Sequence, residues 1–368
     1  MSRRRAVFLL VVISLGGMCS GPSSAPEDRE PESRGLAKVV MGYYPAWKKG
    51  AYDHQKIRYE HLTHIAHAFT KPDPEGRLIV ADHYVYPELV NEAHKSNVKV
   101  LMSVGGWGNC EGFPGMTASL KTRSRFISEV LEFLKTHHYD GVDIDWEYVS
   151  NPVEQESFVL LIKELSAALR AEKPPLELTM AAPSGHYWGK WIRYEEVVDC
   201  FDFVGVMTYD YHGNWSDHSG HNSPLYSCAG DVCGSWHDSY LYHLSRGIPR
   251  EKLLLGLAFF GRSFDCPEFY QPFRVSLQYG YDEVVDLQDS GWASFRDECA
   301  GVPFLRKPDR SAVLSYDDEQ SVGLKCQYVT ENMAAGVIIW ELTNDNARGE
   351  SVLLKRVGES FREGWDLP

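Results

Sequence analysis

An acidic cluster lies within eight positions of the chain, at Asp140, Asp143, Asp145 and Glu147. Apolar residues alternate with the last three acids, which is the pattern of a β-strand whose side chains point to opposite faces in turn. Asp143, Asp145 and Glu147 are therefore expected on one face. Carboxylates this close cannot all be ionised, so at least one should keep a proton, with its pKa well above the usual value. Such a group can serve as a general acid.

The same acids could form a solvated surface or a calcium site. A calcium loop is typically rich in glycine and asparagine and uses backbone carbonyl ligands, whereas these acids alternate with Val142, Ile144 and Trp146. Burying alternate acids without a task would also cost folding free energy. The pattern therefore favours a catalytic cluster.

Eight short runs of apolar and β-branched residues recur along the chain, with amphipathic stretches between them. This alternation predicts a parallel sheet covered by helices, and eight strands predict an α/β fold of the closed (β/α)8 or TIM barrel type. The expected strands are 39–44, 63–68, 99–104, 141–145, 177–181, 203–207, 253–257 and 336–340.

The stretch after the fourth run has the clearest helix start. Asn151 can cap the helix, Pro152 suits its first turn, and Glu154 stands at the capping-box position. An apolar stripe follows and is expected to pack on the barrel. Its members are Phe158, Leu161, Ile162, Leu165 and Leu169.

The amino-terminal residues have the features of a signal peptide: three arginines, an apolar run from Ala6 to Leu15, and small residues from Gly16. That run is too short to span a bilayer, so a secreted protein is expected. We expect a signal peptide over 1–20, a flexible linker over 21–36 and a catalytic barrel over 37–368. Residues 264–315 interrupt the alternation between the last two runs and predict a small α+β insertion.

The net charge of -14 argues against nucleic acid and anionic membranes as partners, because both require basic patches. We expect a monomer without a cofactor. No metal is expected either, since His61, His64 and His67 would scatter over both faces of a strand. The role of His212, His218 and His221, in a loop rich in glycine and serine, stays open.

Seven of the eight cysteines follow the predicted signal peptide, so at least one should remain free. Cys228 and Cys233, separated by four residues, are the best local candidates for a disulfide. Their spacing, without a second paired motif, argues against zinc.

The spacing of Asp140, Asp143, Asp145 and Glu147 resembles the catalytic signature of glycoside hydrolase family 18, the retaining chitinases. The likeness extends from about residue 39 to 361. Lectins of that family lack the final glutamate, which is present here. The resemblance implies a secreted enzyme that cleaves β-1,4-linked N-acetylglucosamine polymers by substrate-assisted catalysis, a known exception to the two-carboxylate mechanism.

The resemblance also assigns catalytic roles. Glu147 would protonate the leaving oxygen and then deprotonate water. Asp145 would orient the 2-acetamido group of the sugar, and Asp143 would exchange a proton with Asp145. Tyr209 would hydrogen bond to the acetamido oxygen. Asp140 is expected to be structural, tuning the charge of Asp143.

Further matches fall at the carboxyl ends of the expected strands, where barrels of this type carry their sites. Ser103, Gly105 and Gly106 are expected to be structural, with the glycines allowing close backbone approach. Arg262 could bind sugar or only pair with an aspartate, and Trp340 could be the floor under the sugar or core packing. The substrate contacts expected from these matches are Tyr44, Trp107, Met207, Asp210, Tyr211, Arg262 and Trp340.

Two other functions stay open. An endo-β-N-acetylglucosaminidase would cut glycoprotein or peptidoglycan-type glycans, and the insertion over 264–315 argues mildly against the glycoprotein-directed kind. A chitin-binding lectin would need no general acid, and the intact Glu147 argues against it. A metal-dependent hydrolase has less support, because no ligand set is visible in the sequence.

Overall fold

The computed structural model describes residues 37–228, 231 and 233–362. The expected signal peptide over 1–20 and the linker over 21–36 lie outside these residues and stay predictions. All structural statements below concern the described part of the chain.

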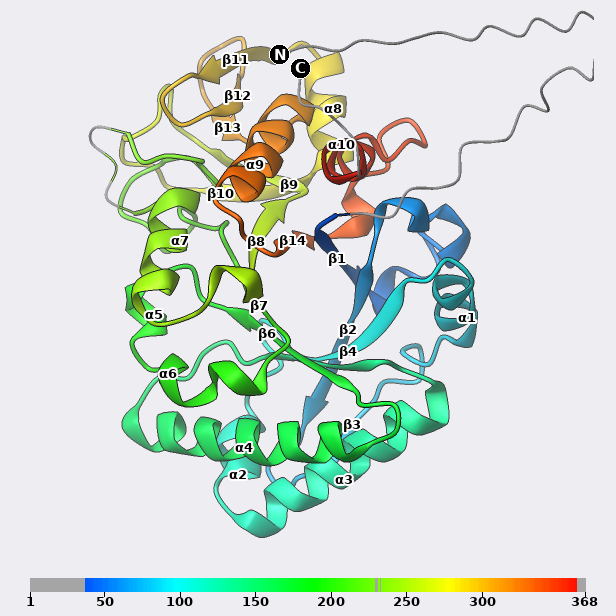
Figure 1. The fold of residues 1–368 in the computed structure, drawn as a ribbon. Helices are drawn as coiled ribbons and strands as arrows, with labels where there is room; N and C mark the ends of the chain where they lie inside the picture. The colour runs from blue at the N-terminus through cyan, green and yellow to red at the C-terminus, as the bar shows by residue number, and fades with distance from the viewer. Residues whose placement is uncertain (1–36, 229–230, 232, 363–368) are drawn as a thin grey trace, which may run out of the picture. The chain divides into compact units, whose positions relative to one another are not determined.

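Eight parallel strands form a closed barrel (Figure 1). Their order is β1-β14-β8-β7-β6-β5-β4-β2, and pairing of β1 with β2 closes the ring. The predicted TIM barrel is confirmed. The strands are β1 Val39–Pro45, β2 His64–Pro72, β4 Lys99–Gly105, β5 Gly141–Asp145, β6 Glu177–Ala182, β7 Phe203–Val206, β8 Leu253–Ala258 and β14 Gly336–Trp340. A short strand, β3 (Leu78–Ile79), pairs antiparallel with β2.

Helices follow most of the barrel strands and cover the outside of the ring, whereas the helix over Tyr281–Asp289 packs on the segment between β8 and β14. They are α1 Pro87–Lys95, α2 Phe113–Thr117, α3 Leu120–His137, α4 Pro152–Ala171, α5 His186–Gly189, α6 Tyr194–Val197, α7 Trp236–Ser245, α8 Tyr281–Asp289, α9 Glu319–Glu331 and α10 Val352–Phe361. Short 3-10 turns are η1 Ala46–Lys48, η2 His54–Lys56, η3 Tyr59–His61, η4 Val198–Cys200, η5 Arg250–Lys252 and η6 Leu342–Asn344.

Helix α4 begins as the sequence predicts. The Asn151 side chain accepts hydrogen bonds from the backbone N–H groups of Val153 and Glu154, which caps the helix. Glu154 accepts from the backbone of Ser150 rather than from that of Asn151. The predicted apolar stripe is buried along its whole length. Burial of a large apolar side chain stabilises the fold by about 1.5 to 3 kcal/mol, so this stripe holds α4 firmly against the barrel.

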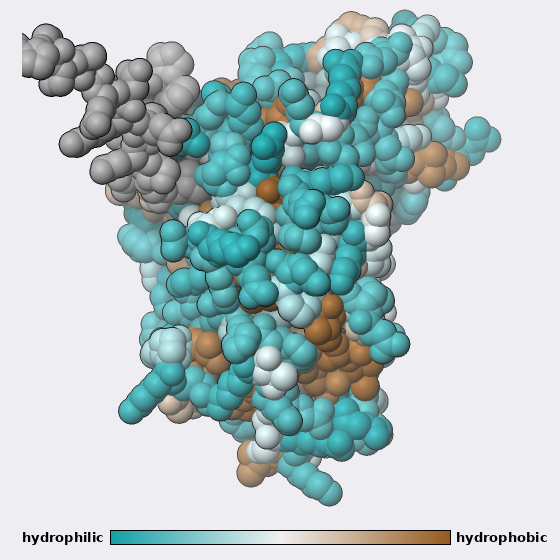
Figure 2. Space-filling model, turned by 90° about the vertical axis from the view of Figure 1, so that its right-hand side faces the viewer, coloured by the Kyte–Doolittle hydropathy of each residue, from teal (hydrophilic) through white to brown (hydrophobic). Residues whose placement is uncertain are grey.

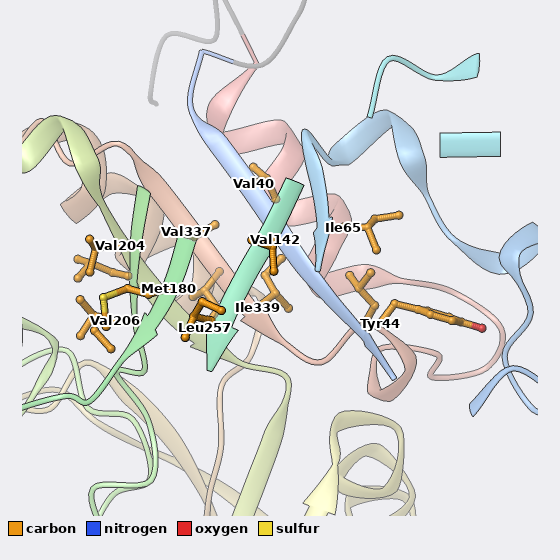
Figure 3. Close-up of a cluster of buried hydrophobic side chains, with 14 of the residues drawn as sticks. Val40, Tyr44, Ile65, Val142, Met180, Val204, Val206, Leu257, Val337 and Ile339 are labelled. Carbon is orange, nitrogen blue, oxygen red and sulfur yellow. The ribbon is translucent and has the colours of Figure 1, made fainter. Parts of the chain in front are cut away.

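Alternation along the strands separates two cores. Outward side chains pack beneath the helices, and Figure 3 shows members of this cluster such as Val40, Val142 and Val337 on three different strands. Inward side chains, including Met41 and Leu254, form a separate small core inside the ring. A polar side chain at an inward position near a strand end therefore faces the barrel mouth.

A second sheet lies between β8 and β14. It is antiparallel, with the order β10-β9-β13-β12-β11, and Figure 1 shows it at the top beside α8 and α9. Its strands are β9 Phe260–Phe264, β10 Ser276–Gly280, β11 Ala293–Asp297, β12 Val302–Arg306 and β13 Val313–Ser315. The sheet begins at Phe260, before the predicted insertion boundary of 264, because β9 follows β8 after a single residue.

Hydrophilic residues predominate on the face of the molecule that Figure 2 shows. Among the described residues, none of the helices combines the length and the apolar character needed to cross a membrane.

Candidate active site

Two of the three acids in the cluster point into the barrel from the end of β5. Val142 and Ile144 belong to the outer core, so Asp143 and Asp145 face inward, with 1% and 4% of their surfaces exposed. Glu147 follows the strand end and is half-buried. The three acids thus form a row from the barrel interior to its mouth.

Three hydroxyl groups hold Asp143 in place. Tyr43 donates to Oδ2 at 2.9 Å and Ser103 donates to Oδ2 at 2.8 Å, while Thr179 donates to Oδ1 at 2.7 Å. These donors come from β1, β4 and β6. Burial raises the pKa of Asp143 above its usual range, and the three hydrogen bonds oppose that rise because they favour the carboxylate.

Asp145 has fewer hydrogen-bond partners than Asp143. Its Oδ1 atom is buried and has no hydrogen-bond partner among the described residues. Burial, followed by the charges of Glu147 and Asp143, raises the pKa of Asp145 well above its usual value. A buried, unpartnered carboxyl oxygen is costly without a ligand, so this atom is suited to receive a donor from a bound molecule.

Glu147 has an environment suited to proton transfer near neutral pH. Burial raises its pKa to about 7, while the neighbouring Tyr148 side chain and the Trp107 backbone oppose that rise. The charge of Asp210 raises the same pKa further. An acid that titrates close to the working pH is an effective general acid and base.

Two glycines let the end of β4 lie against the acids. Gly105 has a φ angle of 113°, and a Cβ atom there would lie 2.1 Å from the backbone oxygen of Asp145. Gly106 has a φ angle of 82°, and its N–H donates to that same oxygen at 2.8 Å. Both positions therefore require glycine, as the sequence suggested.

Aromatic side chains form the floor of the mouth. Trp340, at the end of β14, is half-buried and stacks nearly parallel to Phe69 at 5.7 Å between ring centroids. Tyr43 lies against the same indole at 5.7 Å, and Met207 and Tyr209 pack beside it. Burial and the neighbouring charge of Asp145 raise the pKa of Tyr209, which keeps its hydroxyl available as a donor.

Arg262 connects the second sheet to the barrel rim. Its Nε donates to Oδ1 of Asp210 at 2.6 Å, and its guanidinium lies 4.7 Å from the ring centre of Trp215. A weaker contact to Gln278 measures 3.3 Å. The aspartate pairing that the sequence left open for Arg262 is therefore present, and it fixes a residue of β9 beside β7.

Comparison with known proteins gives the family. Residues 39–345 match the family described as Glycosyl hydrolases family 18. The chain belongs to that family. It is 27% identical to Chitinase A1 of Niallia circulans, covering 88% of this chain and 59% of that protein. The match therefore spans less than two thirds of that relative's length.

Solved structures agree with this assignment. The Group IV chitinase of Ostrinia furnacalis in complex with allosamidin is 28% identical, with a TM-score of 0.78, covering 87% of this chain and 97% of that one. A mutant chitinase from Cycas revoluta in complex with (GlcNAc)4 is 25% identical, with a TM-score of 0.80, covering 88% and 99% of the two chains. The family 18 fold thus extends over nearly all of the barrel and its insertion.

Two predicted positions lie away from the acids in this family 18 protein. Tyr44 points outward into the outer core, as Figure 3 shows, and its hydroxyl donates to the Tyr52 backbone at 2.6 Å. Alternation instead brings Tyr43 inward, a residue that the sequence analysis missed. Tyr211 is also directed away, since its hydroxyl donates to the Ser235 backbone at 2.7 Å and anchors the start of α7. We therefore remove Tyr44 and Tyr211 from the substrate contacts.

The role expected for Asp140 is also corrected. Its carboxylate accepts a hydrogen bond from the backbone N–H of Val100 at 2.7 Å and lies 2.9 Å from Nε2 of His94. These contacts join the amino-terminal ends of β4 and β5, whereas Asp145 and Glu147 lie at the carboxyl end of β5. Asp140 is thus structural, but it does not tune Asp143.

The predicted disulfide is wrong. Cys228 pairs with Cys299, at 5.9 Å between Cα atoms, and Cys233 is free. The backbone N–H of Leu225 donates to the oxygen of Ala300 at 2.8 Å, which brings the two distant loops together. Sequence spacing could not reveal this contact across 71 residues.

Exposed aromatic residues surround the mouth. Trp107, a predicted substrate contact, is 77% exposed after β4. Trp47 follows β1, Tyr187 follows β6 and Trp215 follows β7, and more than half of each residue is exposed. The sequence analysis missed these three, although they lie three to eight residues beyond predicted strand ends, which was the available signal.

Proposed function

We propose that this protein is a secreted retaining chitinase that cleaves β-1,4-linked N-acetylglucosamine polymers by substrate-assisted catalysis. The observation that carries the proposal is the row of three acids, which differ in hydrogen bonding and in pKa. Asp143 has three donors, Asp145 has a buried oxygen without a partner, and Glu147 titrates at about 7. The relatives that are named chitinases, including one bound to (GlcNAc)4, support this substrate class.

The first step breaks the bond between C1 and the glycosidic oxygen. The carbonyl oxygen of the 2-acetamido group attacks C1, while Glu147 gives its proton to the leaving oxygen. The acetamido N–H donates to Asp145, which holds the group beneath C1 and stabilises the positive oxazolinium intermediate. Tyr209 donates to the attacking oxygen and restricts its orientation.

The second step restores the enzyme. Water attacks C1 from the side that the leaving group occupied, and Glu147 accepts the water proton. The bond between C1 and the acetamido oxygen breaks, so the configuration at C1 is retained after two inversions. Asp143 exchanges a proton with Asp145 and limits repulsion between Asp145 and Glu147.

The floor and rim supply the binding surface. Trp340 would stack against the sugar at the cleavage point, since it is a half-buried indole next to the acids. Trp47, Trp107, Tyr187 and Trp215 would hold further sugars, because flat aromatic surfaces stack on the apolar faces of sugar rings. Together, these residues favour an oligosaccharide over a single sugar as the ligand.

The test is product analysis by mass spectrometry. The purified protein is incubated with hexamers of N-acetylglucosamine, with cellohexaose and with a biantennary N-glycan. Cleavage of the N-acetylglucosamine hexamer alone supports the proposal. Cleavage of the N-glycan instead would favour an endo-β-N-acetylglucosaminidase, and binding without cleavage would favour a lectin.

Two variants test the assigned roles. Glu147→Gln should lower the turnover rate by about 10³ or more, within the usual range for general acid catalysis. Glu156→Gln is the matched control, because that glutamate is exposed and pairs only with Arg193 on the surface. Asp145→Asn should still bind the oligosaccharide but turn it over slowly. Full turnover by Asp145→Asn would rule out the substrate-assisted step.

A further inference from the structure

A second group of titratable side chains lies between β7 and α7, and the proposed hydrolysis does not use it. His212, His218, Asp231 and Cys233 each offer one ligand atom, and these four atoms lie within 4.8 Å of one another. The side chains of His212 and Asp231 are 0% and 1% exposed. His218 and Cys233 are half-buried.

The two histidines present free nitrogen atoms to this group. Nδ1 of His212 lies 3.0 Å from the backbone oxygen of His221, and since that oxygen can only accept, Nδ1 carries the proton. Nδ1 of His218 lies 2.5 Å from the carboxylate of Asp217 and is held in the same way. The Nε2 atoms of both rings are buried and have no hydrogen-bond partner among the described residues.

The lone pair of His212 faces another acceptor. Its Nε2 lies 3.5 Å from Oδ1 of Asp231, and in this tautomer neither atom has a hydrogen to donate. Two buried acceptors in this arrangement repel each other unless a proton or a metal ion lies between them. The contacts at Nδ1 are also those seen for metal-binding histidines, whose second nitrogen donates to a carbonyl or carboxylate.

We propose that His212, His218, Asp231 and Cys233 bind a zinc ion, at a site separate from the catalytic acids. Imidazole and thiolate ligands suit zinc, whereas calcium and magnesium prefer oxygen alone. Tetrahedral zinc with bonds of about 2.0 to 2.3 Å separates its ligands by roughly 3.3 to 3.8 Å, so the group needs only a small contraction. The His218 side chain is 22% exposed, so the group lies close to the protein surface.

The structure explains why the sequence predicted no metal. Cys233 had been paired with Cys228, but Cys228 forms its disulfide with Cys299, which leaves the Cys233 thiol free. The four ligands also follow no familiar zinc motif, since they are separated by 5, 12 and 1 residues within the connection from β7 to α7. The backbone N–H of Cys233 donates to Asp231 at 2.9 Å and holds those two together.

The experiment measures zinc bound by the full protein after removal of metal with a chelator, addition of Zn²⁺ and gel filtration. We expect about one zinc ion per chain by elemental analysis, as for a structural site. His218→Gln and Cys233→Ser should each weaken binding at least about tenfold. Both residues are half-buried, so folding should survive, which circular dichroism would verify. His94→Gln and Cys200→Ser, at distant positions, serve as matched controls and should bind like the unmodified protein.

Cobalt gives a second readout that does not depend on activity. Co²⁺ in the site should show the charge-transfer absorption of a thiolate ligand, and Cys233→Ser should abolish it. The proposal is overturned if the unmodified protein holds no zinc, if both ligand variants bind zinc as the controls do, or if peptide mapping finds Cys233 in a disulfide. Because none of these measurements uses hydrolysis, their outcome is independent of the proposed chitinase activity.

Discussion

The proton on Glu147 can be shifted through its neighbour Tyr148. The hydroxyl of the neighbouring Tyr148 side chain lowers the pKa of Glu147 against the effect of burial. Tyr148→Phe removes this hydroxyl but keeps the ring, which stacks on Trp188 at 5.0 Å and 10°. The substitution should therefore raise the pKa of Glu147 above about 7 with little change in packing.

The size of this shift is bounded by the free energy of a hydrogen bond to a charged group. A hydrogen bond to a charged group contributes about 1.5 to 3 kcal/mol, and one pKa unit corresponds to about 1.36 kcal/mol. Glu147 keeps some exposure at the barrel mouth, so water would replace part of the lost interaction. We therefore expect a rise of about one unit, at the lower end of the calculated range.

The direction in which the pH profile should move follows from the proposed role of Glu147 as the general acid. Activity requires its proton, so kcat/KM falls as pH rises through its pKa, and a higher pKa moves this fall to higher pH. The assay is kcat/KM against pH with an N-acetylglucosamine oligomer. Tyr226→Phe is the control, since Tyr226 is 44% exposed and packs against His237 and Tyr328. An alkaline limb that stays in place in Tyr148→Phe, or moves to lower pH, would refute this account of Glu147.

Three further substitutions test the framework around the site. Gly105→Ala should lower the free energy of unfolding, measured by denaturant titration, by at least about 2 kcal/mol. The residue has a positive φ, and a Cβ atom there would lie 2.1 Å from the backbone oxygen of Asp145. Gly50→Ala, where a Cβ atom would meet open space, should be nearly neutral. Asp345→Ala should cost about 1 to 3 kcal/mol by removing the acceptor of two backbone N–H groups in α10. Burial raises the pKa of Asp345 to about 7, so the folded state binds its proton more tightly, and the stability that Asp345 contributes should fall as pH rises from about 4 to 7. Cys299→Ser should cost about 2 to 4 kcal/mol under non-reducing conditions, and an unchanged unfolding midpoint would contradict the pairing with Cys228.

Local sequence patterns predicted the barrel because each element carries its own periodicity. A strand of alternating acids and apolar residues has only one way to face a hydrophobic outer layer, so Asp143 and Asp145 could be placed inside the ring from the sequence. For Tyr43 and Tyr44, this reasoning works only when the inward and outward positions are counted along the strand. Both are tyrosines in one motif, and only the alternation counted from Met41 places Tyr43, rather than Tyr44, beside Asp143.

Contacts between distant segments could not be predicted in this way. The Cys228–Cys299 disulfide joins two loops that meet only because the second sheet folds back on the barrel. Arg262 reaches Asp210 for the same reason. These contacts depend on loop conformations, which leave no periodic pattern in the sequence. Without such a pattern, the short spacing of Cys228 and Cys233 led to the wrong disulfide prediction.

The three acids differ most in the number of hydrogen-bond donors around each carboxyl group. Asp143 accepts from three hydroxyls and is stabilised as a carboxylate, so in the free protein a shared proton is better placed on Asp145. A bound acetamido group would change this balance, because its N–H would give Asp145 the donor that it lacks and favour its ionised form. The displaced proton could then move inward to Asp143, whose burial already raises its pKa. Substrate would thus create the charge on Asp145 that stabilises the oxazolinium intermediate, and a sugar without an acetamido group would leave that charge unformed.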